Sequence, residues 1–304
     1  MAICLALGLG ASRRAIAAEL SEIRERGYLI VAVKNNLPPL GFLDESGHLT
    51  GFEIEIAQRL AEELLGDRNA LQLVPVGNVD RVNAVIDDRV DIAIASITLT
   101  EPRRRIVSFS DPYYLDGVAF LTNQSDIQQL RNLRTAKIAL LDRSSTVPHV
   151  RYILPGAQLV GVHSYEEGRS LLDSGEVHAF AGDASVLSGW MLDMDNASLT
   201  ASEVEIADSG TLVEAGRDNN YQLLSSIISA EPLSIAIPKG TQYASLRESI
   251  NQSIRLWYES GWLQERAAAW GLPAELMPES MPESTQFLEL SPVPPASDAA
   301  PPNL

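Results

Sequence analysis

Asp91–Tyr114 reads D-I-A-I-A-S-I-T-L-T-E-P-R-R-R-I-V-S-F-S-D-P-Y-Y. The apolar run Ile92–Ala95 predicts a buried strand, and the loop that follows carries Ser96, Thr98 and Thr100 before a triplet of arginines. An arginine fork can grip both oxygens of a carboxylate, while hydroxyls and loop amides fill the remaining lone pairs. The segment therefore predicts a carboxylate-binding loop at the end of a strand.

Arg103, the first arginine of the triplet, is expected to hold the carboxylate, with Ser96 and Thr98 beside it. The other two arginines are expected to be solvated or ion-paired. We expect Thr100 to cap the next helix, with Pro102 in its first turn, which would add partial positive charge at the same place.

Short apolar runs alternate with helical patterns on both sides of this segment. Leu29–Val33 predicts a buried strand, and residues 52–64, apolar at every fourth position, predict a helix that stops at Gly66. Further strands are expected at residues 71–76, 90–95, 137–141, 158–162, 177–181 and 233–237, and further helices at 80–87, 147–153, 165–174, 246–258 and 262–270. This alternation predicts an α/β fold with parallel sheets.

Two segments echo one another. Arg81–Ser96 and Arg169–Asp183 each combine a helix, a tight turn and a strand that ends in polar residues. In the first of them, Val82, Val85 and Ile86 are expected to face inward. Because open α/β sheets bind ligands beyond the carboxyl ends of their strands, the repeat predicts two α/β lobes that face each other across a cleft.

The bulk composition limits the function. The chain has 304 residues, enough for two domains, with 45% hydrophobic and 21% charged residues, as in ordinary soluble proteins. A net charge of -17 argues against nucleic acid and anionic membrane surfaces as partners.

Both ends of the chain differ from the middle. Residues 1–18 resemble a secretion signal, with an apolar run before the small-x-small site Ala15-Ile16-Ala17; a cytosolic chain with an apolar start is the alternative. Removal of the signal takes away Cys4, the single cysteine, so we expect no disulfide. Residues 273–304 hold eight prolines, five acidic residues and no basic residue, and are expected to be disordered.

Several motifs, in this order, resemble the polar-amino-acid branch of the periplasmic solute-binding proteins of ABC importers. The resemblance covers about residues 24–271 and is specific as a set. The matching stretches are R-G-Y-L-I-V-A-V-K-N-N-L-P-P-L-G-F, G-H-L-T-G-F-E-I-E-I-A-Q-R-L-A, V-D-R-V-N-A-V-I-D-D-R-V-D-I-A-I-A-S-I-T-L-T-E-P-R, F-S-D-P-Y-Y and E-P-L-S-I-A-I-P-K-G.

The resemblance implies a type II periplasmic-binding fold, in which two crossover strands join two α/β lobes around a ligand cleft. Residues 19–120 and 231–272 would form lobe 1, and residues 121–230 would form lobe 2. The crossings are expected near Phe120 and Glu231.

The resemblance also implies roles for single residues. Arg103 would grip the α-carboxylate of an amino acid, Ser96 and Thr98 would add bonds, and Asp183 would receive the α-ammonium group. Lys34 stands where relatives contact the ligand side chain, which favours acidic or neutral polar amino acids over cationic ones; a lysine in solvent is the alternative.

The remaining candidate contacts come from loops. Asn35 and Leu37 are possible pocket walls. Ser144, Ser145 and Thr146 would reach the ligand from lobe 2, although Arg143 replaces the glycine usual in this loop. Asp183 and the strand-end hydroxyls also suit a purely structural capping role.

Other motifs are interpreted as structural. Phe109–Tyr114 is assigned to packing, and the four histidines lack metal-ligand spacing. Neither a nucleophile-elbow motif nor a phosphate-binding glycine loop occurs in the sequence. We therefore expect no enzyme activity, metal or cofactor.

The resulting hypothesis is a monomeric, extracytoplasmic binding protein that delivers an amino acid to a membrane permease. The alternatives are the ligand-sensing module of a receptor and, on the same fold, a dehydratase-like enzyme.

Overall fold

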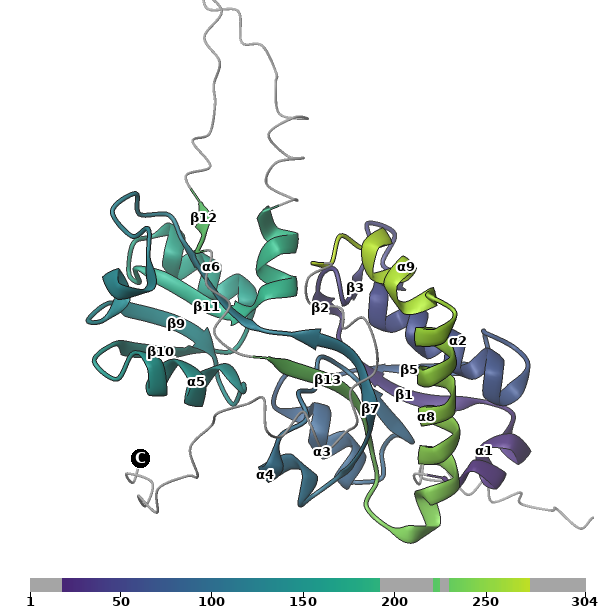
Figure 1. The fold of residues 1–304 in the computed structure, drawn as a ribbon. Coiled ribbons are helices and arrows are strands. Elements are labelled where there is room, and N and C mark those ends of the chain that lie inside the picture. Colours follow the sequence, from purple (N-terminus) through teal and green to yellow (C-terminus); the bar gives the residue numbers. More distant parts are fainter. Residues whose placement is uncertain (1–17, 192–220, 225–229, 274–304) are drawn as a thin grey trace, which may run out of the picture.

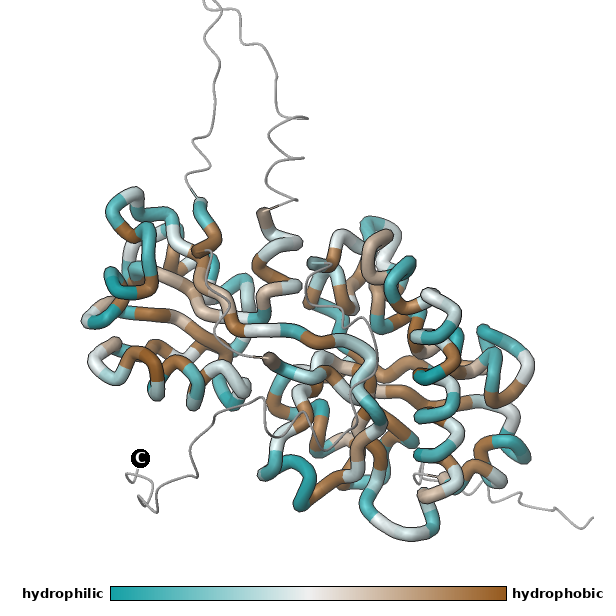
Figure 2. The backbone as a smooth tube through the Cα atoms, in the orientation of Figure 1, coloured by the Kyte–Doolittle hydropathy of each residue, from teal (hydrophilic) through white to brown (hydrophobic). Residues whose placement is uncertain are grey.

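The computed structural model describes residues 18–191, 221–224 and 230–273. The expected signal segment, apart from its last residue, and the acidic tail after residue 273 lie outside these ranges. Within them, two lobes form, each around a five-stranded sheet (Figure 1). Apolar residues line the strands of both sheets, and polar residues cover the outer helices and turns (Figure 2). The expected two-lobed α/β architecture is confirmed.

Lobe 1 is built on the sheet with strand order β5-β1-β6-β13-β7. β1 pairs in parallel with β5 and β6, while β13 runs antiparallel to β6 and β7. The parallel arrangement expected from sequence therefore holds for three of these strands. The strands are β1 (Leu29–Val33), β5 (Leu71–Pro75), β6 (Ile92–Ile94), β7 (Ser108–Asp116) and β13 (Glu231–Ile237).

A small sheet and several helices complete lobe 1. The small sheet contains β2 (Asn36–Leu37), β3 (Gly41–Leu43) and β4 (Leu49–Thr50). The helices are α1 (Leu20–Arg26), α2 (Phe52–Leu65), α3 (Asp80–Ile86), α4 (Glu101–Arg104), α8 (Ala244–Glu259) and α9 (Trp262–Ala269), with a 3-10 turn η2 (Thr241–Tyr243). α2 ends as expected at Gly66, whose φ of 80° is a left-handed conformation that glycine adopts without strain.

The inward face of α3 differs from the expected one. Ile86 is 45% exposed, and the buried positions of the helix are Arg81, Ala84 and Val85. The helix packs on β1, β6 and β13, and this orientation carries Ile86 to the outside. The prediction for Ile86 was wrong because an apolar pattern over so short a helix fits two neighbouring faces.

Lobe 2 is built on the sheet with strand order β10-β9-β11-β8-β12. Its strands are β8 (Val118–Thr122), β9 (Lys137–Leu141), β10 (Gln158–Val162), β11 (Ala179–Asp183) and β12 (Gln222–Leu223). The helices are α5 (Thr146–Ile153), α6 (Tyr165–Asp173) and a helix of residues 184–191, with a 3-10 turn η1 (Leu130–Leu133).

Two long strands connect the lobes (Figure 1). The chain leaves the sheet of lobe 1 at the end of β7, turns at Gly117 and enters lobe 2 as β8, just before Phe120. It returns as β13, whose first residue, Glu231, pairs with Asp116 at the end of β7. Both connections therefore meet at one point, the geometry of a hinge.

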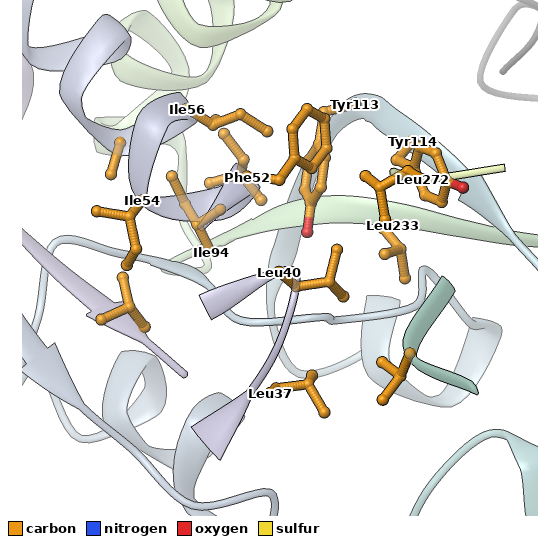
Figure 3. Close-up of a cluster of buried hydrophobic side chains, with 14 of the residues drawn as sticks. Leu37, Leu40, Phe52, Ile54, Ile56, Ile94, Tyr113, Tyr114, Leu233 and Leu272 are labelled. Carbon is orange, nitrogen blue, oxygen red and sulfur yellow. The ribbon is translucent and has the colours of Figure 1, made fainter. Parts of the chain in front are cut away.

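A continuous apolar cluster extends from lobe 1 into lobe 2, and Figure 3 shows part of it in lobe 1. Tyr113 and Tyr114 of β7 are fully buried, and the Phe52 ring meets that of Tyr114 edge-on at 6.0 Å between centroids. The expectation that Phe109–Tyr114 serves packing is confirmed for the two tyrosines.

Candidate ligand-binding site

Ser96 and Asp183 bring the two lobes together at the ends of β6 and β11. The Ser96 hydroxyl donates to Oδ2 of Asp183 at 3.3 Å. Ser96 has a φ of 52°, a left-handed conformation that is uncommon for serine, and its amide donates to Oε1 of Glu53 at 2.7 Å. The buried Glu53 carboxylate thus fixes the loop that presents the Ser96 hydroxyl to the cleft.

Asp183 has the properties of a site for a cation. Its amide donates to the Tyr165 hydroxyl at 3.0 Å, which orients the end of β11. Burial, with the nearby charge of Glu231, raises the pKa of Asp183 to about 6. A buried carboxylate gains from a positive partner, so this position favours an ammonium group.

A pocket surrounds these two residues. It is lined by Lys34, Asn36, Leu37, Asn78, Arg81, Ser96, Leu141, His163, Ser164, Tyr165 and Asp183, residues of both lobes. Its volume is about 10 Å³, the space of about one water molecule. The structure is therefore in a closed arrangement, and a larger ligand requires the lobes to separate first.

Lys34 and Arg81 place two cations in the pocket wall. Lys34 is only 5% exposed, and burial lowers its pKa to about 8. Arg81 is 4% exposed and donates through Nη1 to the carbonyls of Ala95 and Ser96. Lys34 thus points inward, as the ligand-contact interpretation requires, and the alternative of a solvated lysine is wrong.

Arg81 was not among the expected site residues. Its stretch was interpreted only through the periodicity of the helix, in which an arginine is taken as solvent-facing. Its local sequence does not distinguish it from a surface arginine, because its burial goes with hydrogen bonds to the carbonyls of Ala95 and Ser96, 14 and 15 positions away.

Arg103 spans the cleft from α4, the short helix that follows β6. Its Nη1 donates to the Thr98 carbonyl at 2.9 Å, and its Nη2 donates to the carbonyl of Arg143 in lobe 2 at 3.4 Å. Burial lowers the pKa of Arg103 to about 10, so it stays charged at neutral pH. A carboxylate would be a stronger acceptor for this fork than the two carbonyls.

The helix that contains Arg103 is short. α4 has four residues, and Thr100 occupies its N-cap position without a side-chain cap hydrogen bond. A single turn adds little macrodipole, so the local positive charge comes from the guanidinium itself.

The lobe 2 loop places its hydroxyls unequally. Ser145 Oγ lies 3.0 Å from Thr98 Oγ1 across the cleft. Ser144 donates to the Leu141 carbonyl within its own lobe, and Thr146 is buried at the start of α5. Of the three predicted hydroxyls, the structure brings Ser145 to the interface.

Arg143 adopts the conformation of the glycine it replaces. Its φ is 57°, the left-handed region, and its side chain is exposed. The loop shape is therefore retained at the cost of about 1 kcal/mol of backbone strain. Next to it, Asn78 of lobe 1 donates through Nδ2 to the Asp142 carbonyl at 2.8 Å.

Of the two residues expected to form pocket walls, Asn35 and Leu37, the pocket lining contains Leu37. Leu37 lines the pocket together with Asn36, its neighbour in β2. The carbonyl of Asn35 accepts from the Leu43 amide at 3.2 Å, which ties Asn35 to β3.

Asp116 and Glu231, the paired hinge residues, are both buried carboxylates that the sequence analysis did not single out. Asp116 accepts from the Gly117 amide at 2.7 Å, from the Ser185 amide at 3.2 Å and from the Ser185 hydroxyl. Burial raises the pKa of Asp116 to about 8. Glu231 accepts from Thr98 and Ser145 and contacts His149, which is also buried.

The described part of the chain contains no group of three potential metal-ligating side chains. Among the same residues, no helix has the length and hydropathy of a membrane span.

Comparisons with known proteins identify relatives of this chain. Residues 29–273 match the bacterial extracellular solute-binding proteins, family 3. A glutamine-binding protein of Geobacillus stearothermophilus is 31% identical over 226 residues, which cover 73% of this chain and 77% of that protein. The cyclohexadienyl dehydratase of Pseudomonas aeruginosa is 37% identical, but over 130 residues, or 43% of this chain and 47% of the enzyme.

Solved structures show the same architecture. An ancestral arginine-binding protein bound to glutamine superimposes with a TM-score of 0.66 at 27% identity, over 81% of this chain and 98% of that one.

Proposed function

Because the chain belongs to family 3 of the bacterial extracellular solute-binding proteins, we propose that it captures an α-amino acid between its lobes and delivers it to an ABC importer. The single observation that carries this proposal is the hydrogen bond from Ser96 to Asp183 across the cleft. The guanidinium of Arg103 also reaches lobe 2, at the Arg143 carbonyl, although Arg103 is not among the residues that line the pocket. The glutamine-binding relative and the ancestral protein bound to glutamine support an amino acid as the ligand.

The site has one group for each pole of a zwitterion. Arg103 grips the α-carboxylate from lobe 1, and Asp183 accepts the α-ammonium from lobe 2. Neither charge is favourable when buried alone, so a ligand that supplies both partners favours the closed state.

The pocket wall favours an acidic or amide side chain. Lys34 and Arg81 both line the pocket and repel the side chain of arginine or lysine. Glu53 and Asp183 are the acidic groups near Lys34, and burial raises the pKa of both. A side-chain carboxylate or amide oxygen is the complementary group.

Export and docking complete the proposed role. The signal-like residues 1–18 support secretion, and the family consists of extracellular proteins. The partner at the membrane is the permease of an ABC importer, to which the closed protein presents its ligand.

A thermal-shift screen tests the proposal with glutamate, glutamine, arginine and cystine. A ligand at about 100 times its dissociation constant stabilises the folded state by about 2.7 kcal/mol. Glutamate or glutamine is expected to raise the melting temperature most, and arginine least. A flat response to all amino acids would contradict the proposal.

The same samples separate retention from turnover. After binding, the protein is denatured and the released compound is identified by chromatography. Recovery of the unchanged amino acid supports a binding protein, whereas conversion would favour the dehydratase-like alternative.

A further inference from the structure

Glu231 occupies the point where the returning strand enters lobe 1. It is the first residue of β13 and is 1% exposed. Its Oε2 accepts from Thr98 Oγ1 of lobe 1 at 2.9 Å and also from the hydroxyl of Ser145 in lobe 2. One carboxylate thus joins three segments: the loop after β6, the loop before α5 and the crossover strand.

His149 of α5 adds a charge partner to the same carboxylate. Its Nδ1 lies 3.2 Å from Oε1 of Glu231 and 2.9 Å from the Ser145 carbonyl. Both neighbours of Nδ1 are acceptors, so Nδ1 carries a proton. A second proton on the ring makes His149 a cation beside a buried anion.

This arrangement occupies the hydroxyl protons of the interface. Thr98 and Ser145 have one hydroxyl proton each, and both hydroxyls contact Glu231. In the closed arrangement these two hydroxyls stabilise the contact between the lobes directly. A ligand carboxylate therefore depends on Arg103 and backbone amides for its hydrogen bonds.

We propose that Glu231 and His149 form an interlobe clamp, a pair that holds Thr98 and Ser145 together and favours closure of the protein without ligand. Glu231 is in this sense a positioning residue, because it acts on the cleft through the two hydroxyls. Closure then depends on the protonation of His149.

The direction of the pH effect follows from the surroundings of His149. α5 packs on β9 and β11, whose titratable residues are Lys137, which is exposed, and Asp183. The hydrogen bond with Glu231 raises the pKa of His149. Burial by itself raises the pKa of Glu231, but hydrogen bonds from His149 and Ser145 hold this pKa below its usual value.

On this proposal opening separates His149 from Glu231, so the closed state, in which the two side chains touch, binds the proton more tightly than the open state. The clamp is therefore at full strength below the ordinary histidine pKa of 6.5 and weakens as the pH rises through the raised value. Alkaline conditions favour opening.

Double electron–electron resonance tests the clamp by measuring the distance between two spin labels, one in each lobe. The protein is measured without amino acid, so the result is independent of ligand identity. Spin labels are attached in a Cys4→Ser background to Arg68→Cys in lobe 1 and Glu176→Cys in lobe 2, both exposed positions. Distance distributions are recorded at pH 6.0 and 8.5, and thermal melts confirm folding of each variant. We expect a closed population larger by about twofold or more at pH 6.0.

Three variants assign the effect. His149→Gln and Glu231→Gln retain hydrogen-bonding groups but lose the ion pair, and each is expected to reduce or remove the pH dependence. His48→Gln, whose parent side chain is 80% exposed and does not line the pocket, is expected to behave like the wild type. Equal closed populations of the wild type at both pH values would overturn the proposal. An unchanged pH dependence in His149→Gln would also overturn it and assign the effect to Lys34, Asp183 or Asp116.

Discussion

The Ser96 hydroxyl of lobe 1 and the Asp183 carboxylate of lobe 2 meet at 3.3 Å, at the carboxyl ends of two strands from different sheets. The contact exists only when the lobes are closed. An ammonium group that enters at this point therefore binds both lobes at once. The geometry links recognition of the ligand to closure of the cleft.

The first prediction concerns Arg103. Arg103→Ala is expected to weaken amino acid binding by about 2–5 kcal/mol, because it leaves a ligand carboxylate without its charged partner. Isothermal titration calorimetry measures the change. Arg105→Ala, an exposed member of the same triplet, is the matched control and should bind as the wild type does. An unchanged dissociation constant for Arg103→Ala would remove Arg103 from the site.

The second prediction concerns proton uptake at Lys34. Burial lowers the pKa of Lys34 to about 8, so at pH 9 most molecules carry a neutral lysine before binding. A glutamate side chain beside it favours the charged form, and binding is expected to take up close to one proton at pH 9 and far less at pH 7.

Calorimetry in buffers of different ionisation enthalpy measures this uptake. Lys34→Gln should abolish it, while glutamine, which lacks the side-chain charge, should cause less of it in the wild type. Equal uptake by wild type and Lys34→Gln would place the titrating group elsewhere.

The regular elements could be predicted from sequence because their signals are local. Leu29–Val33, Lys137–Leu141 and Gln158–Val162 form strands with the predicted bounds. Each is a short run with a high apolar content, bounded by polar or turn-forming residues. This local pattern is the sequence signal of a strand in a buried sheet.

Arg103 and Asp183 could be named as candidates from sequence because each follows a predicted strand closely. In the structure Arg103 lies in α4, shortly after β6, and Asp183 is the last residue of β11. Arg81, Glu53 and Glu231 do not differ in local sequence from surface charges. Their role follows from partners more than 14 positions away or from burial, which a linear pattern does not contain.

The third prediction concerns the pH dependence of stability at Asp116. Burial raises the pKa of this carboxyl from its ordinary 3.8 to about 8. Between these values the folded protein binds more protons than the unfolded chain, so stability falls as the pH rises through the window. Asp116→Asn removes this titration and keeps a carbonyl oxygen for the Gly117 and Ser185 amides.

Thermal melts from pH 5 to pH 8.5 compare the two proteins. The melting temperature of the wild type should fall more steeply with pH than that of Asp116→Asn, and the variant should be relatively more stable at the alkaline end. Parallel curves would show that Asp116 titrates as it does in the unfolded chain.

The fourth prediction concerns the closest approach of the lobes at Gly189. This glycine lies in the lobe 2 helix of residues 184–191, and a Cβ atom at this position would stand 2.9 Å from Cδ of Pro39 in lobe 1. Carbon atoms pack at about 3.5–4.0 Å, so an added methyl group acts as a wedge against closure. Within its own helix, however, alanine is more favourable than glycine by about 1 kcal/mol. Gly189→Ala should therefore preserve or raise the melting temperature of the free protein while weakening amino acid binding several-fold.

Ser188→Ala, the neighbouring position in the same helix, controls for changes in the helix itself and should leave affinity unchanged. Calorimetry and melts on both variants decide the matter, since wild-type affinity in Gly189→Ala would mean that the lobes close without this contact.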